Sequence, residues 1–305
     1  MRVHVVGNVC IDTTFRLDRF ARPGETLNAD GHSDGIGGKG ANQAVAAART
    51  GAPVDFLAAT GTDAAARTIR EMLSEEFDTA LMPALELPTD RSTIMVDASG
   101  ENIIVSGVTC AEAFDPLLQT GLAASIGDQD IVLLQGNLRA DVTIACLKAA
   151  KASGATTVFN PSPLAPGSSP DLAAADIVIV NEGEAAEISG HADPREAARD
   201  LISRGAGSVV ITLGARGCLV VDRAGGAPDW VEGLRADVVD TSGAGDVFCG
   251  CVAGCLAQKI PLGHAVRIAT AAAALSVGRT GTMQSCPSQQ EMAHLIDMEM
   301  ETENT

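Results

Sequence analysis

The sequence has little positive charge for its size. Its 305 residues include 21 Lys and Arg against 39 Asp and Glu, so the formal net charge is −18. Proteins that bind the backbone of nucleic acids need clustered Lys and Arg, and this balance therefore argues against a nucleic-acid partner. It does not exclude anionic ligands, because backbone N–H groups can bind phosphate without a basic side chain.

Long apolar runs and metal-ligand spacings are also missing. No apolar run approaches the ~18 residues of a membrane span, and the N-terminal MRVHVVG reads as a core strand rather than a signal peptide. The eight cysteines contain no C-x-x-C pair and the five histidines form no spaced ligand set. We interpret Cys249, Cys251 and Cys255 as packing residues of a buried helix rather than a metal site. We therefore expect a cytoplasmic protein with reduced thiols and no membrane partner.

Short apolar, β-branched runs alternate with Ala-rich helical stretches, and the length suits one domain over residues 1–305. This alternation predicts an α/β fold with a mainly parallel, buried central sheet covered on both faces. The expected strands are Val3–Gly7, Val54–Ala59, Ile131–Gln135, Thr157–Asn160, Ile177–Asn181, Val209–Leu213 and Cys218–Val221. The expected helices are Ala41–Thr50, Ala64–Glu75, Val142–Ser153, Pro194–Arg204, Asp246–Gln258, Gly263–Val277 and Ser288–Met298.

Two half-polar stretches, Phe15–Ser33 and Arg91–Val108, break this rhythm. Arg91–Val96 and Glu101–Val105, joined by Asp-Ala-Ser-Gly, read as a hairpin. Segments of about 13–33 and 90–108 therefore predict a small separate sheet that covers a site as a lid, with an ordinary edge excursion as the alternative.

The strongest chemical signal is Asp240-Thr-Ser-Gly-Ala-Gly-Asp246, between an apolar strand-like run, Ala236–Val239, and a helix. Small residues here leave backbone N–H groups unpaired at a helix N-terminus, where the macrodipole favours negative charge. The N–H groups of Gly243, Ala244 and Gly245 would form an anion hole for a phosphoryl group, and Asp246 would accept a proton from an attacking hydroxyl. Helix capping alone would explain one Asp at this position, but it does not explain four consecutive small residues between two aspartates.

A second glycine-rich segment runs from Gly35 to Asn42. It formally contains G-x-G-x-x-G, which motivates a nicotinamide-dependent oxidoreductase as an alternative. That fingerprint needs a hydrophobic strand directly before it within a βαβ unit, and Gly-His-Ser-Asp stands there instead. The segment reads better as a loop entering a helix, with Lys39 and Asn42 able to reach a polyol.

Three weaker signals follow apolar runs. Asn181 and Glu184 could order a hydrated Mg²⁺ and the phosphates it carries, or could simply cap a helix. The turn Thr212–Cys218 lets a ligand approach the backbone, or is only a turn. Asp12 follows the first strand and could receive two sugar hydroxyls, or lie in a surface turn.

Taken in this order, the motifs resemble the ribokinase-like, phosphofructokinase-B-type carbohydrate kinases, from Val3 to about Met298. Ile36–Gly51 looks like the first signature of that family, and Asp240–Gly250 looks like the second. The resemblance implies an ATP-dependent kinase of a small sugar, with a three-layer α/β/α domain, a small β lid and a homodimer. Sugars, ketohexoses, sugar acids and nucleosides all remain candidate substrates, and a non-catalytic sugar sensor is a further alternative.

The resemblance also implies roles for individual residues. Asp246 would be the general base, beside the anion hole of Gly243, Ala244 and Gly245. The sugar would contact Asp12, Gly37, Gly38, Lys39, Asn42 and Asn137. ATP and Mg²⁺ would lie near Asn181, Glu184, Thr212, Gly214, Gly217 and Gly245. A potassium ion would be held by Asp240, Ser242, Ser276, Arg279, Gly281 and Ser285, several of them through backbone carbonyls.

Two positions depart from ribokinases. Cys10 stands where they usually have Asn, and Asn137 stands where they usually have a sugar-contacting Glu. A thiol is a poor hydrogen-bond donor, and sites that bind a substrate hydroxyl discriminate strongly. The catalytic positions are therefore intact, whereas selectivity for D-ribose is in question.

Overall fold

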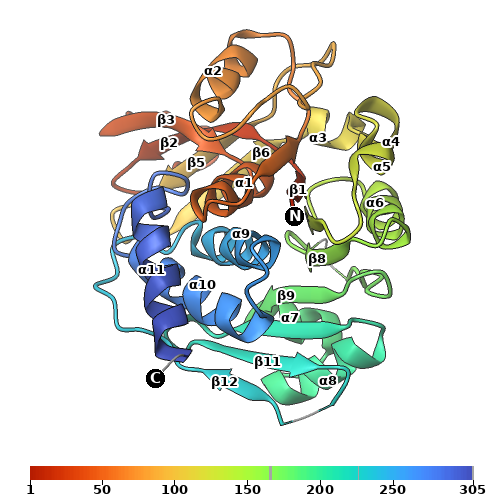
Figure 1. Ribbon diagram of the computed structural model, residues 1–305. Helices are drawn as coiled ribbons and strands as arrows, with labels where there is room; N and C mark the ends of the chain where they lie inside the picture. Colours follow the sequence, from red (N-terminus) through yellow and green to blue (C-terminus); the bar gives the residue numbers. More distant parts are fainter. Residues whose placement is uncertain (165–166, 226, 304–305) are drawn as a thin grey trace.

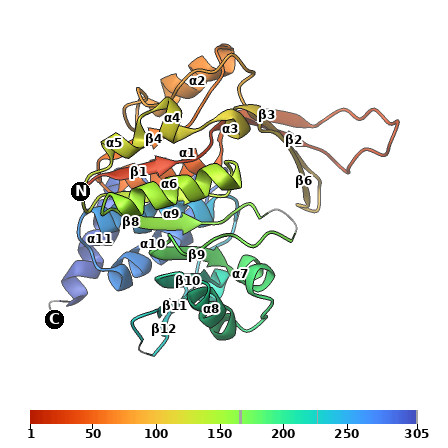
Figure 2. The ribbon, with the colours of Figure 1, turned by 90° about the vertical axis from the view of Figure 1, so that its right-hand side faces the viewer.

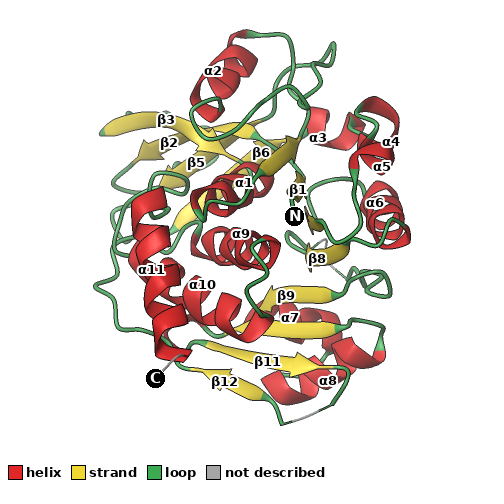
Figure 3. Ribbon diagram, in the orientation of Figure 1, coloured by secondary structure: helices red, strands yellow, loops and turns green. Residues whose placement is uncertain are grey.

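The computed structural model describes residues 1–164, 167–225 and 227–303. Its main sheet has the strand order β12-β11-β10-β9-β8-β7-β1-β4, with helices on both faces (Figures 1 and 3). Neighbours from β10 to β4 run parallel, whereas β11 and β12 are antiparallel at one edge. The strands are β1 (Val3–Val6), β4 (Val54–Leu57), β7 (Ile131–Gln135), β8 (Thr156–Asn160), β9 (Ile177–Asn181), β10 (Ser208–Thr212), β11 (Cys218–Asp222) and β12 (Asp229–Val231).

Each face of this sheet has its own hydrophobic core, because successive strand residues point to opposite faces. In β7, for example, Ile131 and Leu133 join one core, whereas Val132 and Leu134 join the other. The first core is covered by α1 (Lys39–Arg49), α2 (Ala64–Leu73), α9 (Ala244–Ala257), α10 (Leu262–Ser276) and α11 (Gln289–Glu303). The second is covered by α3 (Thr109–Ala113), α4 (Pro116–Gln119), α5 (Leu122–Ser125), α6 (Ala140–Ala152), α7 (Glu182–Ser189) and α8 (Pro194–Ser203). The expected three-layer α/β/α architecture is confirmed.

A second, small sheet has the order β3-β2-β5-β6 and projects from the main body at the right of Figure 2. Its strands are β2 (Cys10–Arg16), β3 (Gly31–Gly37), β5 (Arg91–Val96) and β6 (Asn102–Gly107). The expected hairpin is confirmed, since β5 and β6 pair antiparallel. The edge strand β6 is exposed throughout, including Ile103, Ile104 and Val105. The function of this sheet as a lid and the homodimer stay predictions.

Three expectations about local structure were wrong. Ala236–Val239 is not a strand: Val238 and Val239 are exposed, and the N–H groups of Val239 and Asp240 both bond to the carbonyl of Val277 rather than to a neighbouring strand. Asp12 comes after the first strand, as expected, but the alternative of a surface turn is wrong, because Asp12 lies inside β2, paired with Gly35 of β3.

The third error concerns the glycine-rich segment. It is not a loop, because Gly31–Gly37 forms strand β3 and helix α1 begins at Lys39. Conversely, most of the expected strand-like stretch Phe15–Ser33 is a connection, since residues 17–30 lie outside any strand. The alternation of polar and apolar residues predicted the small sheet but misplaced the ends of its strands. Pairing with β2, and not the local pattern, determines which residues form β3.

No helix in the described part of the chain is long and apolar enough to cross a membrane. Cys249, Cys251 and Cys255 are buried in α9, which confirms that they are packing residues. Across the described residues, no group of three or more His, Cys, Asp or Glu side chains could hold a metal ion.

Helices α1 and α9 pack unusually closely. A Cβ atom on Gly250 would overlap the carbonyl oxygen of Gln43 and lie 2.7 Å from the Cβ atom of Ala46. One turn further on, a Cβ atom on Gly254 would lie 2.8 Å from the carbonyl oxygen of Ala47. Glycine at these two positions therefore lets the two helix backbones approach, which brings the beginning of α9 next to the beginning of α1.

We predict that Gly250→Ala lowers the free energy of unfolding by about 1–3 kcal/mol, because the added methyl group overpacks this contact. Gly263→Ala in α10 is the matched control, since the nearest atom to its Cβ position is 3.9 Å away. It should leave stability unchanged or slightly raised. Urea denaturation of both variants measures the difference, and equal stability would contradict the close-contact interpretation.

Candidate active site

The beginning of α9 has free backbone donors. Gly243, with φ of 78°, precedes the helix, and no side chain caps it. The N–H groups of Gly245 and Asp246 have no hydrogen-bond partner among the described residues. No atom lies within 4 Å of a Cβ position on Gly245, so this end of the helix faces open space. The geometry therefore offers an anion unpaired N–H groups together with the helix dipole.

Asp246 is buried at this helix end, with 5% of its surface exposed. Its Oδ2 accepts a hydrogen bond of 3.1 Å from Nδ2 of Asn42, and its Oδ1 accepts one of 3.0 Å from Nε2 of Gln43. The ammonium group of Lys39 lies 3.7 Å from Oδ1. The negative charge of Asp246 is the main reason that the pKa of Lys39 is raised, and Glu184 adds to it. The predicted residues Lys39, Asn42 and Asp246 thus form one cluster.

Asp12 lies beside this cluster on β2. A Cβ atom on Gly37 would overlap the carboxylate of Asp12, and one on Gly38 would lie 2.8 Å from the carbonyl oxygen of Asn8. These two glycines therefore allow the small sheet and the beginning of α1 to meet. The nicotinamide alternative fails here, because the preceding strand β3 pairs antiparallel within the small sheet and does not belong to a βαβ unit.

Cys10 occupies a hydrogen-bonding position next to Asp12. Its Sγ donates to Oδ1 of Asp12 at 3.2 Å and lies 3.6 Å from Oγ of Ser92. Burial is the main cause that raises the pKa of Cys10 above its ordinary value, so the thiol keeps its proton. Burial also raises the pKa of Asp12, although hydrogen bonds from Cys10 and Ser92 act in the opposite direction.

Three buried acceptors on α1 and at the carboxyl end of β7 lack partners. Oδ1 of Asn42, Oε1 of Gln135 and Oδ1 of Asn137 are buried and make no hydrogen bond within the described part of the chain. Unpaired buried polar atoms are costly, and a ligand hydroxyl could satisfy them. Asn137 follows β7, but no hydrogen bond joins it to the other expected sugar contacts across the residues described.

The expected nucleotide residues lie at the carboxyl ends of β9 and β10, where Thr212 pairs with Asn181. Asn181 and Glu184 form a capping box on α7: Oδ1 of Asn181 accepts from the N–H group of Glu184 at 2.8 Å, and Oε2 of Glu184 accepts from the N–H group of Asn181 at 2.9 Å. The expected helix cap is therefore confirmed. Because the cap uses only Oε2 of Glu184, Oε1 stays available to an ion or to one of its water ligands.

The turn between β10 and β11 contains the other two expected nucleotide contacts. No atom lies within 4 Å of a Cβ position on Gly214, so the backbone there is open to a ligand. A Cβ atom on Gly217 would overlap the carbonyl oxygen of Val231, so packing against β12 already requires glycine at that position.

The expected potassium ligands come from the loop before α9 and from the end of α10 with the loop that follows it. Oδ1 of Asp240 accepts from the N–H group of Ser242 at 2.9 Å, and Oδ2 accepts from the N–H group of Gly281 at 3.0 Å. Burial acts to raise the pKa of Asp240, but the hydrogen bonds from Ser242 and Gly281 together with the charge of Arg16 lower it below its ordinary value. The Arg279 guanidinium pairs with Glu291, so only its carbonyl could face an ion. Ser276 and Ser285 are both buried. Asp240 thereby joins the two segments, and the oxygen atoms that they offer are the ligand type that a monovalent cation prefers.

Sequence reasoning missed three polar residues behind Asp246. Gln43 follows Asn42 on α1, and Gln135 and Asn160 are the last residues of β7 and β8. All three are buried. Polar residues at the carboxyl ends of apolar parallel strands were the available signal, since α/β sheets bind ligands there.

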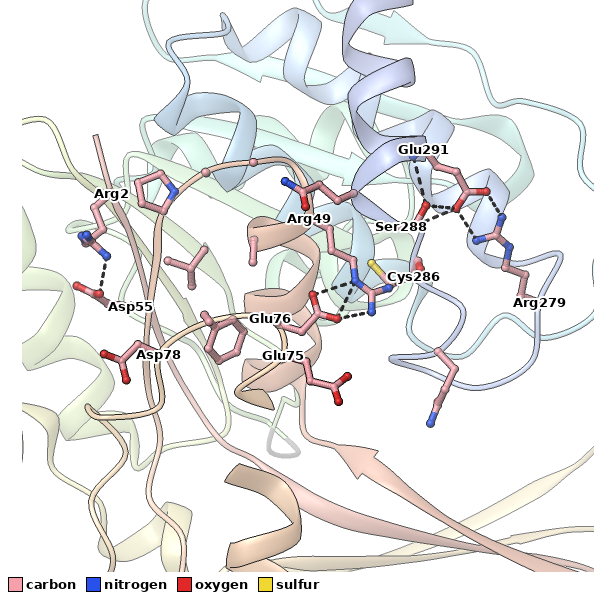
Figure 4. A pocket seen from close by; sticks show the side chains of 18 residues that line it. Arg2, Arg49, Asp55, Glu75, Glu76, Asp78, Arg279, Cys286, Ser288 and Glu291 are labelled. Atoms are coloured by element: carbon pink, nitrogen blue, oxygen red, sulfur yellow. Dashed lines mark hydrogen bonds and ion pairs between the residues drawn. The ribbon is translucent and has the colours of Figure 1, made fainter. Parts of the chain in front are cut away.

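A cavity of about 1010 Å³ lies away from this cluster, between the ends of α1 and α2 and the beginning of α11. Figure 4 shows that its arginines face carboxylates: Arg2 pairs with Asp55, Arg49 with Glu76, and Arg279 with Glu291. Of the expected site residues only Arg279 lines it. Glu75 and Asp78 add further negative charge to its lining, so the described lining of this cavity offers an anionic ligand no unpaired cation, and the Asp246 cluster is the better candidate active site.

Comparison with known proteins agrees with this fold. The model of the pfkB family carbohydrate kinases matches residues 2–289. The chain is 34% identical to ribokinase of Mus musculus, covering 95% of this chain and 93% of that protein. It is 32% identical to ribokinase of Haemophilus influenzae, covering 96% and 97%. The structure of Arabidopsis thaliana ribokinase complexed with ribose and ATP superposes with a TM-score of 0.86 at 26% identity, covering 96% of this chain and 98% of that one.

Proposed function

The chain belongs to the pfkB family of carbohydrate kinases and is an ATP-dependent, ribokinase-like sugar kinase, and we propose that Asp246 is its general base. The observation that supports this role is the juxtaposition of a buried carboxylate with free N–H groups at the beginning of α9. A base and an anion hole side by side suit the transfer of a phosphoryl group to a hydroxyl.

In this mechanism the sugar hydroxyl oxygen attacks the γ-phosphorus of ATP in line. The new O–P bond forms as the bond to the departing ADP oxygen breaks, and the hydroxyl proton passes to the carboxylate of Asp246. The N–H groups of Gly243 and Gly245 would stabilise the charge of the phosphoryl oxygens, whereas that of Ala244, also expected in the anion hole, already donates to the carbonyl oxygen of Thr241 at 3.4 Å. Lys39 and Asn42, which contact Asp246 directly, would hold the sugar beside it.

ATP would lie along the carboxyl ends of β9 and β10, over Thr212 and Gly214. Mg²⁺ supplies charge neutralisation on the phosphates when it is bound. The carboxylate of Glu184 would orient the water shell of this ion, because one of its oxygens is fixed by the capping box. Closure of the small sheet over the sugar would exclude water from the reaction.

We predict that Asp246→Asn lowers kcat by about 10²- to 10⁴-fold, the usual contribution of a general base. Asp130→Asn is the control, because Asp130 accepts hydrogen bonds from Arg2, His4 and Gly127 at the opposite end of β7. Its kcat should stay within about twofold of wild type. ADP release with ATP, Mg²⁺ and sugar measures both variants, and circular dichroism checks their fold. A fully active Asp246→Asn enzyme would exclude the proposed base.

The side chain of Cys10 offers a bound sugar little hydrogen bonding. The Cys10 hydrogen is already donated to Asp12, and a thiol is a weak donor and acceptor. A site discriminates strongly only against analogues that leave its buried polar groups unpaired. Discrimination between D-ribose and analogues that lack one hydroxyl should therefore be weak.

This predicts less than a ~10-fold preference in kcat/KM for D-ribose over its deoxy analogues in wild type. Cys10→Asn should raise the preference, because an amide offers two donors and an acceptor. Cys218→Ser, a buried thiol of β11 that lies 3.8 Å from Oγ1 of Thr270, is the control and should leave the ratio unchanged. The assay panel also includes ketohexoses, sugar acids and nucleosides. A wild-type preference for D-ribose of about 10³-fold would refute this account.

We further propose a potassium ion held by Asp240, Ser242, Ser276, Arg279, Gly281 and Ser285. Asp240 bridges the two loops, and Gly243 packs against Thr282 at the edge of the anion hole. An ion there would fix the free N–H groups near the phosphoryl oxygens.

Replacing K⁺ by tetramethylammonium should therefore lower kcat several-fold in wild type. Asp240→Ala, which loses both loop hydrogen bonds, should have a kcat that no longer responds to K⁺. Steady-state rates at constant ionic strength measure this. Equal wild-type rates with both cations would contradict the proposed site.

A further inference from the structure

Gln43 contacts Asp246 from the side that a substrate cannot reach. It is fully buried, and its Nε2 donates to Oδ1 of Asp246 at 3.0 Å and to Oδ1 of Asn160 at 3.3 Å. Its Oε1 accepts a hydrogen bond of 2.8 Å from Nε2 of Gln135. Every polar atom of this side chain therefore has a protein partner.

The direction of these hydrogen bonds is set by a backbone carbonyl. Nδ2 of Asn160 donates to the carbonyl oxygen of Ile179 in β9 at 2.9 Å. Because a carbonyl oxygen can only accept, Asn160 must turn Oδ1 toward Gln43. Gln43 must then present its NH₂ group to Asn160, and its Oε1 to Gln135. A flipped Gln43 amide would place its oxygen against both Asn160 Oδ1 and Asp246 Oδ1, and its NH₂ group against that of Gln135.

The other two donors to Asp246 are differently placed. Lys39 has 36% of its side chain exposed, and Asn42 keeps an unpaired Oδ1. Both are sugar-binding residues in the proposed function, so a bound sugar competes with Asp246 for their hydrogen bonds. Gln43 has no such competitor. Among the described side chains that donate to Asp246, it is the fully buried one whose polar atoms are all bonded within the protein.

We propose that Gln43 is a positioning residue that holds the Asp246 carboxylate in its reactive orientation throughout the catalytic cycle. Gln135 and Asn160 lie opposite each other on β7 and β8, and their side chains anchor Gln43 to the carboxyl ends of the main sheet. The proton-accepting carboxylate is therefore aligned by the rigid sheet and not by the sugar. This inference rests on the proposed role of Asp246 as the base.

The test compares Gln43→Met, which keeps the length of the side chain but removes its donors, with wild type. Misplacement of a catalytic group affects the reacting state more than binding. We expect kcat to fall about 10- to 100-fold, in line with the loss of a hydrogen bond to a charged group, while KM for the sugar changes by less than about threefold. Gln43→Asn, which is one methylene shorter, should show the same split and serves if the Met variant does not fold.

A matched control removes a different glutamine between the same two helices. Nε2 of Gln258, at the end of α9, donates to the carbonyl oxygen of Thr50 at the end of α1 at 3.1 Å. Gln258→Met should leave kcat unchanged, because it acts at the opposite end of the helix pair. Equal losses in the Gln258 and Gln43 variants would show that only helix packing matters and would overturn the inference.

A double-mutant cycle separates this inference from the proposed function. In an Asp246→Asn background, Gln43→Met should lower the residual kcat by less than about twofold, because no carboxylate remains to be aligned. The same fold-loss in both backgrounds would overturn the positioning role. An inactive Asp246→Asn with a fully active Gln43→Met would overturn it while leaving the base intact. A fully active Asp246→Asn would instead overturn the proposed function, and the inference with it.

Discussion

The close contact between α1 and α9 is the constraint on which the candidate active site depends. Asp246 meets Asn42 and Gln43, residues more than 200 positions earlier in the chain, because Gly250 lets the two helix backbones approach. A larger residue there would separate the helices and move the carboxylate away from its donors. The packing of α1 against α9 in the first core therefore also sets the geometry of the Asp246 cluster.

Burying a charged carboxylate explains why so many amides gather around it. A buried charge is tolerated only with hydrogen-bonding partners, and Asp246 has Asn42, Gln43 and Lys39. The amides of Gln135 and Asn160 behind them connect the cluster to the central sheet. The main sheet thus supplies rigidity, whereas the loops at its carboxyl edge supply the open backbone donors that a ligand requires.

Much of this arrangement could be read from the sequence. Apolar runs located the parallel strands, because a strand buried on both faces must be apolar throughout. The run of small residues before Asp246 located the helix end with free N–H groups. The glycine-rich segment was harder to read, since glycines do not reveal whether they form a loop or a strand. Pairing with β2, including Asp12 against Gly35, made Gly31–Gly37 a strand. Val238 and Val239 gave the opposite error, because their β-branched side chains indicated a strand where none forms. No strand lies beside them, and both residues remain exposed.

The sequence by itself determined the alternation of the main strands and helices, the family resemblance and which carboxylate to propose as the base, because these depend on local patterns of residues. Only the tertiary structure decided which side chains meet. The Asn160 amide is oriented by the carbonyl of Ile179, Gln43 is oriented by Asn160 and Gln135, and Asp246 is held by Gln43. Each of these hydrogen bonds joins residues that are distant along the chain, and its direction follows from partners that no local pattern contains.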